Sequence, residues 1–477
     1  MATEIPVYHL LIDGEWVVTD EYTDVHDKYT GETIAKIAKA TKSHIDLAVT
    51  AAQKSFKENR LSAFRRYEIL LKTAELMEQR REHLEYSLVQ EVGKTVKDAK
   101  GELDRAISTF RISAEEGKRI AGEMVPLQGV PGSENRLGFT IRVPKGVIGA
   151  ITPFNYPLLL GAHKIAPALA AGNTVVLKPA TVTPIASFHL VNLLHEAGLP
   201  KSCIQVITGS GKDVGDWLLA DQRIAMYTFT GSSEVGASIK AKSGLRPVAL
   251  ELGNNSPNII HNDADLALAA EQTARRSFHN AGQACIAVQR IYVHQNVLDE
   301  FTNRYLTIVR ELKVGNPKDP ETDVGPMIEE REARRSEEWV QEAVAAGAKL
   351  LFGGRREGAL FYPTVLTNVS PEMKVVCREV FAPIVTIIPY QTIDEAIALA
   401  NQSEYGLQAG IFTRDINIAL KASRELEYGG VIVNDVSTYR NDVMPYGGVK
   451  NSGLGKEGPR YAIEEMTEER MVVLNLF

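Results

Sequence analysis

The alternation of short apolar strands with helices between residues 147 and 251 constrains the fold of this chain most strongly. Strands alternating with helices predict a parallel, doubly wound α/β sheet. The pattern returns after residue 255, and at ~100–200 residues per domain the 477 residues suit two such α/β domains. We expect strands at 147–151, 174–178, 204–207, 225–230, 247–251, 384–389 and 431–434, and helices at 157–171, 184–197, 264–280, 297–312 and 330–346.

The segments outside this alternation predict other elements. Residues 45–120 place apolar side chains at spacings of three and four, which indicates helices. Residues 137–143 alternate and then meet a Pro-Lys-Gly turn, which predicts an exposed strand. The terminal run 471–476 is apolar, and an apolar edge strand suits pairing with another chain.

Composition excludes several classes of protein. A content of 44% hydrophobic and 24% charged residues rules out global disorder, and a net charge of −7 leaves no basic excess for nucleic acid or an anionic membrane. Cys203, Cys285 and Cys377 are odd in number and far apart, which predicts neither a disulfide framework nor a metal site. With no apparent signal peptide or membrane span, we expect a cytoplasmic protein.

Three segments hold candidate catalytic residues. Cys285 lies among small residues that would let a substrate approach a thiolate, and Glu251 ends a predicted strand, where ligands bind in open α/β sheets. Residues 152–157 follow a strand and open a helix, so their amides and the Asn155 side chain could stabilise an oxyanion. Taken singly, each has a plainer alternative: a buried structural cysteine, a surface glutamate and a proline-stabilised turn.

Two glycine-rich segments are weaker signals of phosphate binding. Residues 209–215 have GxGxxxG spacing and not the dinucleotide fingerprint GxGxxG. Residues 230–236 lie between a strand and a helix, where backbone N–H groups could hold a phosphate. The Walker pattern is absent, which argues against a P-loop NTPase.

Seven segments in this order resemble the aldehyde dehydrogenase superfamily over essentially the whole chain. They are TPFNYP at 152–157, ALAAGNTVVLKPA at 168–180, FTGS at 229–232, ELGNNSP at 251–257, GQAC at 282–285, EVFAP at 379–383 and PYGGVKNSGLG at 445–455.

The resemblance implies a covalent mechanism. Cys285 would attack the aldehyde carbonyl, and the Asn155 side chain with the Cys285 N–H would bind the oxyanion. Hydride would pass to a nicotinamide and leave a thioester, which water activated by Glu251 would hydrolyse to the acid. The presence of Glu251 also favours hydrolysis to the acid over acyl transfer to coenzyme A. Lys178 would lie in the site and bond the cofactor ribose.

The same resemblance implies an NAD or NADP site. Glu379 would hold the nicotinamide ribose, Phe381 would pack on the ring, and Ser232 with the Gly231 amide would meet the pyrophosphate. Thr181 stands where NAD-selective relatives often carry a glutamate, so the preference stays open. The remaining cofactor residues are Thr152, Pro153, Phe154, Ala180, Gly211, Gly215, Phe229, Thr230, Val235 and Leu252.

The substrate is predicted from the mouth of the site. Tyr156, Arg105 and Arg440 resemble the corner of relatives that oxidise lactaldehyde and small aldehydes with anionic tails, because arginine binds such tails bidentately. Two departures stand out: Ala284 replaces an arginine found before the nucleophile of several anion-specific relatives, and Asn254 replaces a glycine. We expect His163 and His279 to be packing or helix-cap residues.

The sequence leaves three alternatives. A succinate-semialdehyde dehydrogenase would share the mechanism. A cysteine hydrolase or acyltransferase would need a histidine base beside Cys285, and a non-catalytic binding protein would lack Cys285, Glu251 or Asn155. We expect a Rossmann-like cofactor domain (1–126 and 148–252), a catalytic domain (253–465) and an oligomerisation element (127–147 and 466–477). A homodimer or homotetramer follows.

Overall fold

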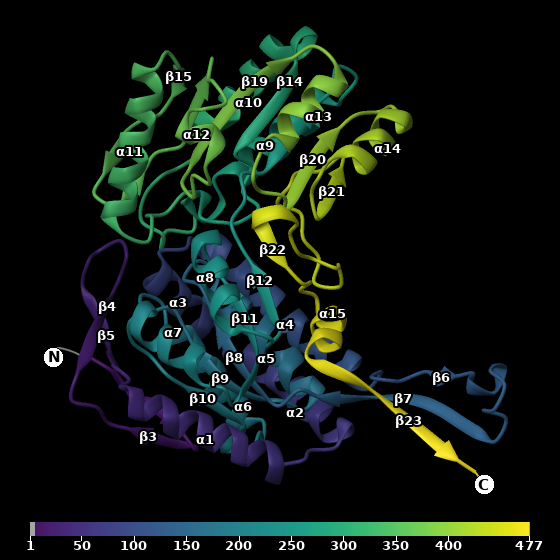
Figure 1. Ribbon diagram of the computed structural model, residues 1–477. Helices are drawn as coiled ribbons and strands as arrows, with labels where there is room; N and C mark the ends of the chain where they lie inside the picture. The colour runs from purple at the N-terminus through teal and green to yellow at the C-terminus, as the bar shows by residue number, and fades with distance from the viewer. Residues whose placement is uncertain (1–4, 477) are drawn as a thin grey trace.

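The computed structural model describes residues 5–476 and confirms the α/β class, with two helix-covered sheets and a projecting ribbon (Figure 1). Five strands of the first sheet are parallel, and the edge strands pair antiparallel. In order across the sheet they are β22 (Gly453–Leu454), β12 (Val248–Glu251), β11 (Ile224–Thr230), β8 (Val147–Ile151), β9 (Thr174–Lys178), β10 (Ile204–Val206), β2 (Leu10–Ile12) and β3 (Glu15–Val17).

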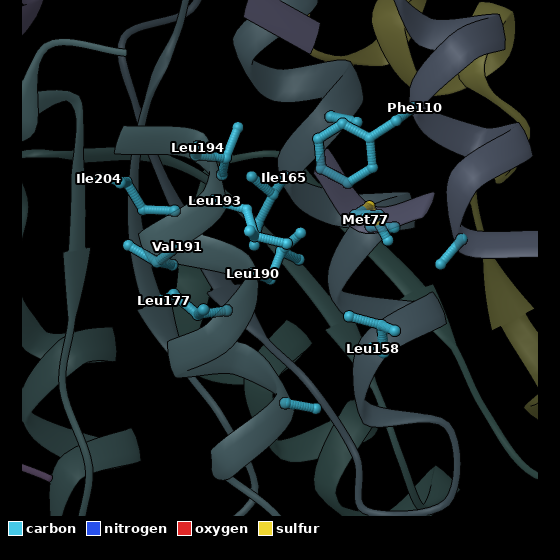
Figure 2. Close-up of a cluster of buried hydrophobic side chains, with 14 of the residues drawn as sticks. Met77, Phe110, Leu158, Ile165, Leu177, Leu190, Val191, Leu193, Leu194 and Ile204 are labelled. Carbon is cyan, nitrogen blue, oxygen red and sulfur yellow. The ribbon is translucent and has the colours of Figure 1, made fainter. Parts of the chain in front are cut away.

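Helices cover this sheet and build its core. Figure 2 shows Phe110, Leu158, Ile165, Leu177 and neighbouring apolar side chains packed between the helices and the sheet. Burying each such side chain stabilises the fold by about 1.5–3 kcal/mol. The helices are α1 (Lys42–Glu58), α2 (Ala63–Gln79), α3 (Arg81–Val92), α4 (Val96–Gly117), α5 (Pro157–Ala171), α6 (Ile185–Glu196), α7 (Gly211–Ala220) and α8 (Ser233–Ser243).

A second α/β body follows after residue 256. Its sheet runs β15 (Lys349–Phe352), β18 (Thr364–Thr367), β19 (Ile384–Tyr390), β14 (Arg290–His294), β13 (Pro257–Ile260), β20 (Gln408–Phe412) and β21 (Gly430–Val433), and β15 is antiparallel. Its helices are α9 (Leu266–Ser277), α10 (Leu298–Glu311), α11 (Glu330–Ala345), α12 (Lys374–Cys377), α13 (Ile393–Asn401) and α14 (Ile416–Glu425). Two small sheets are separate from both large ones. The first consists of β1 (Val7–Tyr8), β5 (Thr33–Ala38) and β4 (Tyr22–His26), and the second of β16 (Arg356–Glu357) and β17 (Leu360–Phe361).

The order of the first sheet creates a crevice. The chain adds β9 and β10 on one side of β8, then β11 and β12 on the other, so the winding reverses between β8 and β11. Ligands of open α/β sheets bind at the carboxyl ends of the strands at such a switch point. Thr152 and Gly231 directly follow these two strands.

A ribbon of three strands leaves the body and carries the C-terminus (Figure 1). β23 (Thr467–Asn475) pairs antiparallel with β7 (Arg136–Pro144) over nine residues, and β6 (Met124–Val125) adds to β7. Met471, Val473 and Leu474 are exposed on it. Residues 5–476 contain no helix that is long and apolar enough to cross a membrane.

The structure corrects two boundaries. β22 pairs with β12, and α15 (Pro459–Glu465) packs on α4 and α5, so residues 453–465 belong with the first sheet and not with the second as the range 253–465 predicts. The glycine-rich segment 209–215 is largely helical, because Ser210 caps α7 by accepting from Asp213 N, and Gly211 and Gly215 lie inside that helix.

Candidate active site

A cavity of about 380 Å³ lies between the two α/β bodies and collects the predicted substrate residues and three of the four predicted catalytic residues, whereas Lys178 does not line it. The first body supplies Glu251, at the end of β12, and the start of α5. The second supplies Cys285, and the segment between β21 and β22 completes the lining. Among the residues predicted from the sequence, Cys285, Glu251, Asn155, Tyr156, Arg105 and Arg440 all line this cavity.

Cys285 sits on a strained loop. Asn280 and Ala281 have φ values of 49° and 53°, a left-handed conformation that costs a non-glycine residue about 1 kcal/mol or more. Gly282 also has positive φ, and a Cβ there would lie 2.2 Å from the Ala382 carbonyl oxygen. This conformation requires support from outside the loop.

Hydrogen bonds from α4 and the second body provide that support. Asn280 N donates to Asp98 Oδ2 at 3.0 Å, and Gln283 accepts from Ile328 N at 2.9 Å. Asn280 Nδ2 donates to the Asn155 carbonyl oxygen at 3.2 Å. The loop is therefore tied to the residue expected to bind the oxyanion. Gln283 belongs to the GQAC motif but had no role assigned to it, and Asp98 and Asn280 were not singled out in the sequence.

Asn155 precedes α5, whose start is fixed by a buried carboxylate. Pro157 opens the helix, and Glu102 Oε1 accepts from Leu158 N and Leu159 N at 2.9 and 3.1 Å. Asn155 Nδ2 donates one hydrogen to the Gln283 carbonyl at 2.9 Å. An amide nitrogen carries two hydrogens, so the second is available to a ligand.

Burial controls the protonation of the two reactive groups. It raises the pKa of the Cys285 thiol, and the neighbouring carboxylates Glu379 and Glu251 raise it further. The pKa of Glu251 is raised by burial and then by Glu457. Within the described chain, Glu251 Oε2 has no hydrogen-bond partner, although it is buried. A carboxyl in this state can exchange a proton with a bound water.

A further set of hydrogen-bond donors and acceptors lies at the carboxyl ends of β8 and β9 and in the second body. Thr152 Oγ1 is buried and without a partner among residues 5–476, and burial lowers the pKa of Lys178 to about 8. Ser232 caps α8, whose N-terminus favours anions. Glu379 accepts from Asn254 N at 3.0 Å, and burial raises its pKa to about 7. This set suits a ligand with phosphates and sugar hydroxyls.

The structure corrects two details of the predicted cofactor site. Gly231 N donates to the Glu251 carbonyl oxygen at 3.0 Å, so this amide is not directed at a phosphate. The Thr181 hydroxyl donates to the Gly209 carbonyl at 2.7 Å and is already engaged. Phe381 meets Phe154 edge to face with ring centres 5.8 Å apart. The remaining predicted residues Pro153, Ala180, Phe229, Thr230, Val235 and Leu252 flank the ends of β8, β9, β11 and β12.

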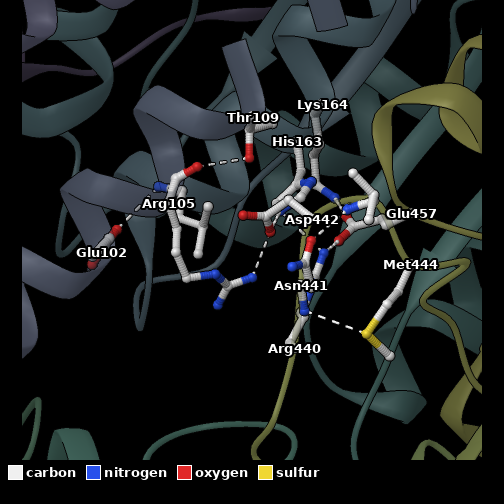
Figure 3. A network of polar contacts seen from close by, with 12 residues as sticks. Glu102, Arg105, Thr109, His163, Lys164, Arg440, Asn441, Asp442, Met444 and Glu457 are labelled. Carbon is white, nitrogen blue, oxygen red and sulfur yellow. Dashed lines mark hydrogen bonds and ion pairs between the residues drawn. The ribbon is translucent and has the colours of Figure 1, made fainter. Parts of the chain in front are cut away.

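A polar network borders the cavity (Figure 3), and of its members only Arg105 and Arg440 were predicted from the sequence as site residues. We call it the basic cluster, and its members are Arg105, His163, Lys164, Arg440, Asp442 and Glu457. Arg440 Nη2 donates to Glu457 Oε2 at 2.9 Å, and Lys164 Nζ donates to Glu457 Oε1 at 3.1 Å. His163 and Lys164 interrupt an otherwise apolar helix, which was the available signal. His163 is buried, as a packing residue would be, and it also contacts Asp442 and Arg440, which the expectation of packing or capping did not include.

Comparisons with known proteins find relatives over nearly the whole chain. The model of the "Aldehyde dehydrogenase family" matches residues 16–472. A 3-sulfolactaldehyde dehydrogenase of Priestia aryabhattai is 56% identical over 99% of both chains, and a lactaldehyde dehydrogenase of Methanococcus maripaludis is 41% identical over 98% of this chain and 100% of its own. A solved glyceraldehyde-3-phosphate dehydrogenase of Methanocaldococcus jannaschii, complexed with NADP, has a TM-score of 0.92 at 41% identity, covering 96% and 100%.

Proposed function

Because the chain belongs to the aldehyde dehydrogenase family, and is an oxidoreductase that oxidises a small aldehyde to its acid with NAD or NADP, we propose that its substrate carries an anionic tail. The tail we favour is a sulfonate on a three-carbon hydroxyaldehyde, which is the substrate named for the Priestia relative. Membership of this family decides against a cysteine hydrolase or acyltransferase. The lactaldehyde-type relatives do not favour a succinate-semialdehyde substrate.

The observation that carries this proposal is a pair of incompletely bonded arginines at the cavity. Arg105 and Arg440 both line it. Within residues 5–476, the Nε atom of each is buried and without a hydrogen-bond partner. A buried donor without an acceptor is costly, and an anionic oxygen would satisfy both.

The charges of the basic cluster also favour an anionic substrate. Its basic side chains Arg105, Lys164 and Arg440 are paired with two carboxylates, Asp442 and Glu457. Burial and Arg440 lower the pKa of His163, so the imidazole adds no charge near neutral pH. Within the cluster, three positive charges face two negative ones, and Glu251, the next carboxylate to Arg440 and Lys164, compensates less of this excess because its pKa is raised by burial and by Glu457. A sulfonate would supply the missing negative charge.

The described residues fit a nicotinamide dinucleotide. We assign the pyrophosphate to the N-terminus of α8, and the sugar hydroxyls to Lys178 and Glu379, which are buried and have bonding capacity to spare. When bound, the nicotinamide accepts a hydride. On this assignment the first sheet is the cofactor domain and the second body the catalytic domain.

The catalytic roles follow from the groups that face the cavity. The Cys285 thiol adds to the aldehyde carbon and its proton passes to the carbonyl oxygen, which gives a thiohemiacetal whose oxygen Asn155 Nδ2 and Cys285 N–H bind. After oxidation the acyl group is held on sulfur as a thioester. Glu251 then takes a proton from water, which attacks the thioester and releases the acid.

Replacement of Arg105 tests the anionic tail. We expect wild type to prefer 3-sulfolactaldehyde over lactaldehyde, which has the same carbon skeleton without the sulfonate. Arg105→Gln should lower the ratio of the two kcat/KM values about 10–100-fold, because a charge-assisted hydrogen bond is lost. Steady-state kinetics measure the ratio, and Arg111→Gln, at an exposed position of the same helix, is the matched control. Equal kcat/KM for both aldehydes in wild type would contradict the proposal.

We further propose that the ribbon of β7 and β23 joins subunits into a homodimer or homotetramer. An exposed apolar edge strand is a liability in a monomer. Sedimentation should give two or four times the chain mass of 52.4 kDa, and Val473→Glu should shift it towards one. A wild-type monomer would refute the proposal.

The three unpaired cysteines suit a cytoplasmic location, which cell fractionation tests.

A further inference from the structure

Asp442 makes contacts that the reaction itself does not require. It does not line the cavity within the described chain, and its side chain is 5% exposed. Asp442 Oδ1 accepts from Arg105 Nη2 at 2.7 Å and lies 3.1 Å from His163 Nε2. Figure 3 shows it between the two arginines that border the cavity. Asp442 Oδ1 therefore contacts Arg105 directly, and it also contacts His163, which lies next to Arg440.

His163 connects Asp442 with Arg440. The same Nε2 atom lies 3.1 Å from Arg440 Nη2. A ring nitrogen either donates or accepts at one time, so Nε2 cannot bond to both partners. A bond to an ionised carboxylate is charge-assisted and favours a proton on Nε2. In that tautomer Nε2 offers Arg440 no acceptor, so Arg440 Nη2 donates to Glu457 Oε2 alone, at 2.9 Å.

Arg105 needs such a partner. It projects from α4 with a side chain that is 32% exposed, and a flexible side chain in this position loses conformational freedom when it binds a ligand. The bond to Asp442 fixes the guanidinium before the substrate arrives. Binding then costs less, because part of the ordering has already taken place.

We propose that Asp442 is a positioning residue that orients Arg105 directly, and Arg440 through the tautomer of His163, to give the enzyme its preference for an anionic aldehyde. The proposal rests on the anionic substrate proposed above. Asp442 acts on specificity and has no part in the chemical steps at Cys285.

The test compares two aldehydes in Asp442→Asn, which keeps the shape of the side chain and removes its charge. We expect KM for 3-sulfolactaldehyde to rise about tenfold, while KM for lactaldehyde and both kcat values change less than about twofold. An equal rise in KM for both aldehydes would show a structural role only and overturn the proposal. A fall in KM for 3-sulfolactaldehyde would overturn it too, because Asp442 would then be a competitor of the tail.

A double-mutant cycle with Arg105→Gln separates this inference from the proposed function. If Asp442 acts through Arg105, Asp442→Asn should change the ratio of kcat/KM much less in the Arg105→Gln background than in wild type. Fully additive effects would overturn the direct path. If wild type shows no preference for the sulfonate, the proposed function fails and this inference fails with it. If the preference exists but Asp442→Asn leaves it intact, only this inference fails.

His163 offers a second pair of variants. The amide nitrogen of Gln can replace a donating Nε2, whereas Leu cannot donate. His163→Gln should keep the ratio of kcat/KM within about threefold of wild type, and His163→Leu should lower it about tenfold. Identical ratios for the two variants would contradict a role for the Nε2 proton.

Discussion

Cys285→Ala is expected to lower kcat about 10⁴-fold or more with every aldehyde, because no other group can form the thioester from which the acid is released. The fold should persist, since Cys285 packs among small residues and its side chain makes no hydrogen bond to the described chain. Steady-state kinetics measure kcat. Binding of NADP, followed by fluorescence, should remain, because the donors assigned to the dinucleotide lie on other segments.

Cys377→Ala is the matched control for this variant. Cys377 is partly buried like Cys285, but it lies at the end of α12 and is bonded to the Glu372 carbonyl, away from the catalytic cavity. Its removal should change kcat less than about twofold. Comparable activity losses in both variants would mean that Cys285 is not the nucleophile. Loss of NADP binding in Cys285→Ala would indicate damage to the fold.

Glu251→Gln should leave formation of the thioester fast and make release of the acid slow. Formation of the thioester does not need the carboxylate, so one equivalent of reduced cofactor should appear as a burst. Release of the acid should slow about 10²–10⁴-fold, because the general base is gone. Rapid-mixing absorbance measures the burst, and mass spectrometry of the quenched protein should find the acyl group on Cys285.

Two controls make this result specific. Hydroxylamine attacks thioesters without a general base, so it should restore turnover in Glu251→Gln and give the hydroxamate. The variant should be at least as stable as wild type at pH 8. Burial and Glu457 raise the folded-state pKa of Glu251, so its ionisation destabilises the fold as pH rises above the unfolded-state pKa, and glutamine has no such cost. Loss of the burst would mean that Glu251 acts before the thioester forms.

The same shift predicts how acyl release depends on pH. A base acts only when deprotonated, and the pKa of Glu251 lies above the usual carboxyl range. The rate of acyl release in wild type should therefore rise with pH through the range above pH 5 and fall on the acid side. A rate that stays flat down to pH 5 would contradict Glu251 as the base.

The two sheets were predictable from the sequence because local patterns encode them. The strands β8 and β9 lie within the residues expected for them, and α5 ends at Gly172, whose φ of 91° only glycine adopts easily. The alternation predicted a helix between the strands at 204–207 and 225–230, but the glycines of 209–215 suggested a loop where α7 already begins, because Ser210 supplies its cap. The boundary at residue 465 was wrong because β22 pairs with a strand some 200 residues earlier, and no local pattern reports such pairing.

The sequence by itself determined the α/β class, the family and the residue types at Cys285, Glu251 and Asn155, because motifs of contiguous residues carry that information. The tertiary structure decided how these residues meet and what surrounds them. The strained loop at Asn280 depends on contacts far along the chain, such as the bond to Asp98 of α4, 182 positions away. The pairing of Arg440 with Glu457, and of Arg105 with Asp442, depends on buried contacts between separate elements. Charges acquire partners, and pKa values shift, only once the folded chain excludes water around them.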